Sequence, residues 1–183
     1  SRGLGDVYKR QHEADCIYAG ILIDTSNFMT KTGVRTFEAA AYLKRCGAEV
    51  TRVRKMLRND MDAYKARAEV VRHAEVYRGA FAISICPADK IESPTIVGAQ
   101  AADELLNIVG IKASFVLTEY QGKIYVSSRS IDEINVQKIM ERLGGGGHLN
   151  MAGCQLRDCT VSQAQRIIED TIDEMLEEGD IEE

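Results

Sequence analysis

A run of four glycines followed by a histidine is the part of this sequence best suited to bind an anion. Glycines have no Cβ, so they can turn several N–H groups toward one point and let a ligand approach the main chain closely. The histidine ring adds an N–H donor, or a positive charge near neutral pH. A flexible linker with a surface histidine is the alternative, but four glycines between two packed elements favour a binding loop. We therefore predict a phosphate-binding loop made of Gly144, Gly145, Gly146, Gly147 and His148.

Three serines and one arginine, at residues 127–130, form a second polar group between a predicted strand and a predicted helix. Such junctions expose polar groups in α/β folds, and a helix N-terminus favours an anion. The guanidinium of Arg129 is suited to fork onto a phosphate or to stack on a base. A solvent-exposed helix cap, with Ser130 as N-cap, explains the same residues equally well. Ser128 and Arg129 are the candidate substrate-binding residues of this group.

One carboxylate is a candidate metal ligand, although its position alone is weak evidence. Asp24 follows the apolar stretch GILI, where a cap or turn residue is the more usual interpretation. The sequence contains no HxxH or DHH motif, and His12 and His73 are isolated. A metal site that uses Asp24 therefore needs ligands beyond these residues.

The composition is that of a globular chain. Of its 183 residues, 45% are hydrophobic, and the formal net charge is −5. This balance argues against duplex nucleic acid as a partner, but it allows one small phosphorylated ligand to bind locally. Five cysteines without CxxC spacing indicate reduced thiols. No run of 18 apolar residues and no signal peptide is found, so a cytoplasmic domain is predicted.

The hydrophobic pattern divides the chain into three parts. Residues 1–11 lack an apolar period and are interpreted as a foreign leader, which would make this chain a fragment. Residues 12–76 are predicted to be helical. Residues 77–183 are predicted to form a small α/β domain with a mixed sheet and the order β-α-β-β-α-β-α. The predicted strands are 80–86, 113–119, 122–128 and 151–157, and the predicted helices are 95–108, 131–142 and 161–177.

Three stretches together resemble the DHH phosphoesterase superfamily. LGGGGH at 143–148 is similar to the signature of its DHH-associated C-terminal domain, and SSRSIDEINVQKIMERL at 127–143 is similar to the segment before that signature. AGILIDTSNFMTKTGVRTFEAAAYLKRCGA at 19–48 most resembles the GdpP-type cyclic-di-AMP phosphodiesterases. The resemblance implies that residues 12–76 are the C-terminal remnant of a DHH catalytic domain. It implies that residues 77–183 are the substrate-binding domain.

The resemblance also implies a reaction and a cofactor. The family hydrolyses phosphoric esters with two Mn²⁺ ions, and in this superfamily Asp24 matches the last aspartate ligand. Arg129, the glycine run and His148 match the substrate-binding face. The parent protein is then expected to hydrolyse cyclic di-AMP to pApA. One aspartate cannot hold two metal ions, so this chain alone is expected to be inactive. A homodimer is possible, and membrane attachment is expected only through N-terminal helices of the parent.

Two other functions remain open at this stage. One is an oligoribonuclease or 3′-phosphoadenosine phosphatase of the same superfamily, whose substrate would be a short linear dinucleotide or a bisphosphate. The other is a non-catalytic nucleic-acid-binding module, similar to the domain attached to alanyl-tRNA synthetases. The net charge of −5 speaks against the second.

Overall fold

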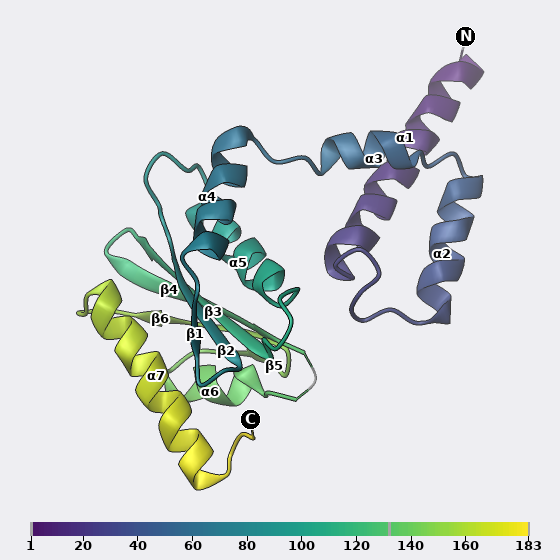
Figure 1. Ribbon diagram of the computed structural model, residues 1–183. Helices are drawn as coiled ribbons and strands as arrows, with labels where there is room; N and C mark the ends of the chain where they lie inside the picture. The colour runs from purple at the N-terminus through teal and green to yellow at the C-terminus, as the bar shows by residue number, and fades with distance from the viewer. Residues whose placement is uncertain (1, 132, 183) are drawn as a thin grey trace. The chain divides into compact units, whose positions relative to one another are not determined.

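A computed structural model describes residues 2–131 and 133–182, so Ser1, Asp132 and Glu183 lie outside the described residues. The chain divides into two compact units, Ser1–Asn59 and Asp60–Glu183 (Figure 1). Each unit is described by itself below. No helix in the described part of the chain is both long enough and apolar enough to cross a membrane.

The first unit contains three helices, α1 (Arg2–Asp24), α2 (Val34–Arg45) and α3 (Val50–Met56). The residues interpreted as a foreign leader are helical from Arg2 onward and continue directly into the helix that ends at Asp24. A small apolar cluster holds the three helices together, with Ala14, Leu43 and Ala48 at its centre. Polar contacts also hold the helices together. The buried Asp15 of α1 accepts hydrogen bonds from the backbone N–H of Glu49, just before α3, and from Nε of Arg52 on α3.

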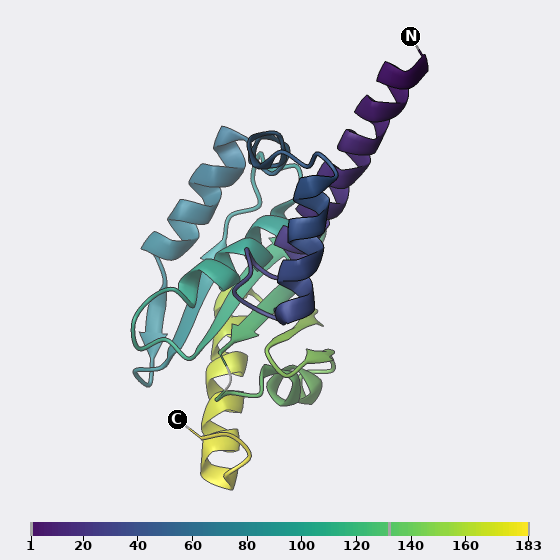
Figure 2. The same cartoon turned by 90° about the vertical axis from the view of Figure 1, so that its right-hand side faces the viewer.

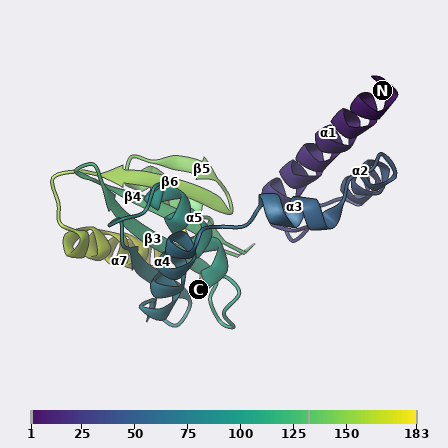
Figure 3. The same cartoon turned by 90° about the horizontal axis from the view of Figure 1, so that it is seen from above.

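The second unit is built on one six-stranded sheet with the strand order β1-β2-β3-β4-β6-β5. Strands β2 and β3 are parallel and all other neighbours are antiparallel, so the sheet is mixed, as predicted. Figure 3 shows β5 at the outer edge beside β6. The strands are β1 (Glu75–Tyr77), β2 (Phe81–Cys86), β3 (Ala113–Tyr120), β4 (Lys123–Ser130), β5 (Gly146–His148) and β6 (Met151–Leu156). The helices are α4 (Met61–Arg72), α5 (Pro94–Leu105), α6 (Val136–Arg142) and α7 (Val161–Glu178).

Helices cover the two faces of this sheet in separate layers (Figures 1 and 2). Successive residues of a strand point to opposite faces, so each strand contributes to two cores. The core on the α4 and α5 side buries Ala82 and Val116 of the sheet against Val70 and Ala101. This layer lies over β2, β3 and part of β4.

The opposite core is larger and holds α6 and α7. It buries Phe115 and Val126 of the sheet against Ile139, Ile168 and Ile172. The apolar residues of α7 recur at helical spacing, and its N-cap Thr160 accepts a hydrogen bond from the backbone N–H of Gln163. The sequence prediction of this helix at 161–177 is confirmed by the observed Val161–Glu178.

The second unit begins earlier along the chain than the predicted boundary near residue 76. Helix α4 belongs to it, because Ala66 and Val70 are buried in the core between α4, α5 and the sheet. The hydroxyl of Ser84 on β2 also donates to the carbonyl of Val70 at 2.7 Å. Tertiary packing, which the hydrophobic pattern of a single helix does not show, assigns this helix to the sheet.

Candidate functional site

The glycine run has two parts with different structures. Gly144 and Gly145 end helix α6, with Gly144 at φ +78° and the N–H of Gly145 donating to the Met140 carbonyl at 2.8 Å. Gly146–His148 then form β5, which pairs antiparallel with β6. The predicted loop between helix and strand is therefore a helix end followed by a short edge strand.

Two of these glycines are required by the close approach of β6. A Cβ placed on Gly145 would collide with the carbonyl oxygen of Gly153 and with Cys154. A Cβ on Gly147, whose φ is +150°, would collide with the Met151 carbonyl and with Ala152. Open space surrounds Gly146, so a side chain added at this position would meet no other atom.

Arg129 and His148, both predicted from the sequence, lie in one line across three strands. Arg129 of β4 pairs with Met151 of β6, and Met151 pairs with His148 of β5. Residues directly opposite each other in a sheet point to the same face. We call this arrangement the Arg129–His148 row. It places a guanidinium and an exposed imidazole on one face, the face that α5 covers farther along the sheet.

Ser128, the third predicted residue, lies on the other face. Its side chain is fully buried, and its hydroxyl oxygen has no hydrogen-bond partner among the described residues. The four polar residues at 127–130 are inside β4 and not at a helix start, so they alternate between the faces. Ser128 therefore cannot contact a ligand on the open face, and Ser127 occupies that face instead. Ser130 is not an N-cap either, because Asn135 caps α6.

A carboxylate holds the side chain of Arg129 in place. Its Nε donates to Oδ1 of Asp103 on α5 at 3.0 Å, and its Nη1 donates to the Ser128 carbonyl at 2.9 Å. Nη2 has no hydrogen-bond partner within residues 2–131 and 133–182. Burial raises the pKa of Asp103, and the neighbouring guanidinium opposes that shift. One edge of a fixed guanidinium thus stays available to an anion.

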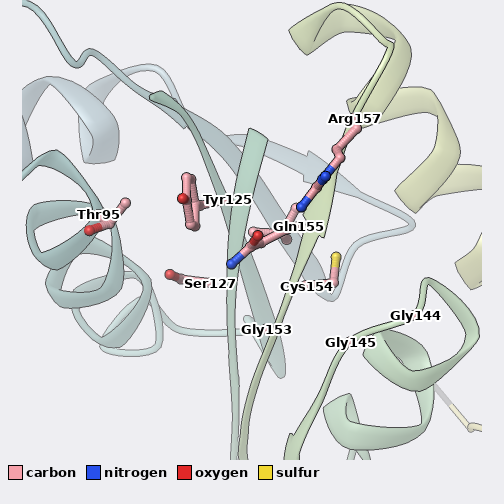
Figure 4. A pocket seen from close by; sticks show the side chains of 10 residues that line it. Thr95, Tyr125, Ser127, Gly144, Gly145, Gly153, Cys154, Gln155 and Arg157 are labelled. Atoms are coloured by element: carbon pink, nitrogen blue, oxygen red, sulfur yellow. The ribbon is translucent and has the colours of Figure 1, made fainter. Parts of the chain in front are cut away.

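A hollow of about 510 Å³ lies beside the row on the same side of the sheet (Figure 4). We call it the β4–β6 hollow. Hydroxyl, amide, guanidinium and glycine backbone groups face it, and no carboxylate does. Its lining residues are Thr95, Tyr125, Val126, Ser127, Gly144, Gly145, Gly153, Cys154, Gln155 and Arg157.

Among these lining residues, sequence reasoning named Gly144 and Gly145 as site residues and placed Ser127 in the polar group at 127–130. Tyr125 and Gln155 are paired across β4 and β6, and Thr95 comes from the first turn of α5. Their separation along the chain forms no motif. The alternation along β4 was the one available signal, because it places Tyr125 on the same face as Ser127 and Arg129.

Comparison with known proteins assigns the second unit to a family. Residues 80–178 match the DHHA1 domain. The chain belongs to the DHHA1 domain family. A DHHA1 domain was expected at residues 77–183, so the match lies within the predicted segment.

The relatives of this DHHA1 chain include phosphodiesterases. A cyclic-di-AMP phosphodiesterase, PdeA, of Listeria monocytogenes is 43% identical and covers 88% of this chain and 24% of its own length. A cyclic-di-AMP phosphodiesterase, GdpP, of Bacillus subtilis is 41% identical and covers 91% of this chain and 26% of its own length. The chain thus spans about a quarter of the length of these curated relatives.

A solved structure shares the fold. It is an exopolyphosphatase-related protein from Bacteroides fragilis, superposed with a TM-score of 0.79. The match covers 88% of this chain and 50% of that chain at 21% sequence identity. At this identity the likeness shows the fold alone.

The predicted metal ligand lies in the first unit, outside the DHHA1 domain. Asp24 is exposed at the C-terminal end of α1. Within the described residues, no group of three or more His, Cys, Asp or Glu side chains lies close enough to hold a metal ion. The residues present therefore do not fit a two-metal site, and Asp24 would supply at most one ligand.

Proposed function

We propose that this chain is the nucleotide-binding part of a phosphodiesterase that hydrolyses cyclic di-AMP to pApA. Two observations support this function: the family of the second unit, and relatives above 40% identity that are named cyclic-di-AMP phosphodiesterases. Because the chain spans about a quarter of those relatives, the hydrolytic activity is proposed for the whole protein and not for this chain alone.

The observation that carries the proposal is the Arg129–His148 row. A phosphate seated there would accept hydrogen bonds from Nη2 of Arg129 and from the ring of His148. The backbone of β5, half-buried at Gly146 and exposed at Gly147, adds main-chain groups to this site. Arg129 is positioned in advance by Asp103, so little side-chain entropy is lost on binding.

Two Mn²⁺ ions are the proposed cofactor of the whole protein. They would supply the activated water for hydrolysis. The described residues lack the ligands for such a pair, so we assign no step of the reaction to them. The contribution of this chain is to bind and orient the nucleotide.

The surrounding charge favours a small ligand over a nucleic acid. Residues 60–183 contain 12 Lys and Arg against 22 Asp and Glu. A module that binds RNA along its backbone needs a basic stripe, which this balance does not provide. The anion is therefore expected to bind locally, at Arg129 and His148, and not along an extended surface.

Calorimetric titration of cyclic di-AMP into this chain tests the proposal. His148→Ala should weaken binding about tenfold, because a hydrogen bond to a charged group is lost. The matched control is His73→Ala, which removes an exposed histidine at the end of α4 and should leave the affinity unchanged. Equal affinity in the wild-type chain and His148→Ala, or no binding by a folded chain, would overturn the proposed phosphate site.

Hydrolysis rates of the whole protein separate the substrates. The rate on cyclic di-AMP should exceed those on pApA and adenosine 3′,5′-bisphosphate. A higher rate on the bisphosphate would assign the protein to the phosphatase branch instead.

A further inference from the structure

The β4–β6 hollow differs in charge from the unit around it. None of its ten lining residues is acidic, although residues 60–183 carry 22 Asp and Glu. Arg157 at its rim is exposed and has no ion-pair partner in the described part of the chain. Arg157 is thus a cation without a carboxylate partner, and it lies beside hydroxyl and amide groups. Such a group of residues suits a polar ligand that carries a negatively charged group.

Two glycines contribute main chain to the hollow. Gly145 and Gly153 line it, and we call these two positions the glycine floor. A Cβ on Gly153 would meet the carbonyl oxygen of Val126, so β4 fills the direction in which a side chain would point there. A planar ring can lie on main chain at van der Waals distance. No other type of residue would fit at Gly145, because its Cβ would collide with β6.

Three side chains rise around this floor. Tyr125 and Gln155 face each other across β4 and β6, and Thr95 approaches from α5 (Figure 4). Tyr125 is half-buried, so its ring presents one side to the hollow. An aromatic ring stacks on any nucleobase, and a glutamine amide pairs a donor and an acceptor with the edge of adenine.

The spacing along β4 relates the hollow to the Arg129–His148 row. Tyr125 lies four residues from Arg129, which is about 13 Å at the rise of a β-strand. Ser127 lies between them on the same face and offers a hydroxyl at the mid-point. Along this face of β4, the proposed phosphate-binding residue Arg129 is thus followed by the hydroxyl of Ser127 and then by the aromatic ring of Tyr125.

We propose that the β4–β6 hollow is a nucleobase subsite. It holds the base of a nucleotide whose phosphate lies on the Arg129–His148 row, and so it rests on the proposed function. Tyr125 stacks on the base, Gln155 contacts its edge, and Ser127 contacts the sugar. Tyr125 and Gln155 are thereby specificity residues of the chain, separate from the glycine–histidine signature.

Backbone amide chemical shifts of the full chain test this subsite, with inorganic phosphate and pApA as probes. Inorganic phosphate should shift the amides of Gly146, Gly147 and His148 only. The dinucleotide pApA should also shift the amides of Gly145 and Gly153, which lie on the floor of the hollow. These glycine amides suit the measurement because they belong to the two proposed sites themselves, β5 and the β4–β6 hollow.

Variants of Tyr125 separate stacking from phosphate binding. Tyr125→Ala should lower the affinity for pApA about tenfold and abolish the Gly145 and Gly153 shifts, while phosphate binding stays unchanged. Tyr125→Phe, which keeps the ring, should bind pApA within twofold of the wild type. Tyr42→Ala, at an exposed tyrosine of α2 in the first unit, is the matched control and should have no effect.

The possible failures are distinguishable. If pApA shifts the β5 amides but Tyr125→Ala binds it like the wild type, the subsite is wrong and the proposed phosphate site stands. If neither probe shifts any amide of the folded chain, both the subsite and the proposed phosphate site are overturned.

Discussion

Arg129 on β4 and Asp103 on α5 form an ion pair, with Nε and Oδ1 separated by 3.0 Å, on the face where the ligand is proposed to bind. The arginine side chain is only 12% exposed, whereas that of Asp103 is 44% exposed. The carboxylate therefore fixes a largely buried cation and leaves one edge of its guanidinium free. This pair links the helix layer to the proposed phosphate site.

Removing the carboxylate should weaken anion binding through the orientation of Arg129. We expect Asp103→Ala to reduce phosphate affinity several-fold, because the guanidinium loses its partner and its fixed geometry. Glu104→Ala is a matched control, since the neighbouring Glu104 pairs with Arg67 away from the row. Phosphate titration monitored at the amides of β5 gives both affinities. Unchanged affinity in Asp103→Ala would show that Arg129 needs no positioning.

The same carboxyl should give a pH dependence of stability. Burial raises the pKa of Asp103, so the folded state holds this proton more tightly than the unfolded state. Its contribution to the free energy of unfolding is therefore largest at low pH and decreases as pH rises through the folded pKa. Asp103→Asn, which cannot ionise, should lack this decrease. Urea unfolding between pH 3 and 7 would show it, and parallel pH profiles would contradict the assignment.

Alanine substitutions along the glycine run should differ according to the space around each residue. Gly145→Ala and Gly147→Ala should each destabilise the second unit by about 1–3 kcal/mol, because the added methyl group collides with β6. Gly146→Ala should change stability little, since open space surrounds that position. Urea denaturation compares the three variants directly. Equally small effects at all three positions would show that the run is a flexible linker.

The buried carboxylate of the first unit should respond to acid in the opposite sense to Asp103. The hydrogen bond from Arg52 lowers the pKa of Asp15, so its stabilising contribution is complete above the unfolded pKa of about 3.9. That contribution is lost as pH falls through the folded pKa.

Substitution at this carboxylate should affect the helical unit at neutral pH. We expect Asp15→Asn to lower its melting temperature by roughly 5 °C at pH 7. The difference from the wild type should shrink below pH 4. Asp6→Asn on the same helix is the control, because Asp6 is exposed. Thermal scans followed by circular dichroism measure both, and a constant difference at all pH values would disagree with the lowered pKa.

The cysteines should differ in their reaction with iodoacetamide. Burial raises the pKa of Cys86 to about 11 and that of Cys154 to about 12, so both are protonated at neutral pH and shielded from solvent. Cys16 and Cys46 are exposed and should be labelled first. Mass spectrometry of the folded chain over time gives the order. Rapid labelling of Cys154 would show that β6 beside the hollow readily becomes exposed to solvent.

Much of the architecture could be predicted because its elements carry periodic apolar residues. The strand predicted at 151–157 is observed at Met151–Leu156, and the one predicted at 113–119 is observed at Ala113–Tyr120. Strand β5 was missed, since glycines lack the branched and aromatic side chains that indicate a strand. Helix α6 was predicted from residue 131 but begins at Val136, where Asn135 caps it.

The candidate site could be predicted only in part, because a run of polar residues does not reveal which face each one occupies. Arg129 and His148 were identified from residue type, and pairing through Met151 brings them into one row. Ser128 has the same polarity as Ser127 but points into the core. The lining of the hollow needed the sheet register, which no local pattern contains.

The glycine floor has a consequence for how such a site can change in evolution. A surface made of main chain offers the same shape whatever the substrate, and a side chain added at Gly145 or Gly153 would collide with β6 or β4. Selectivity must then be altered at the rim, where the side chains of Tyr125, Gln155 and Arg157 line the hollow. A constant main-chain surface with variable side chains at its rim would let one domain bind different nucleotides after a few substitutions.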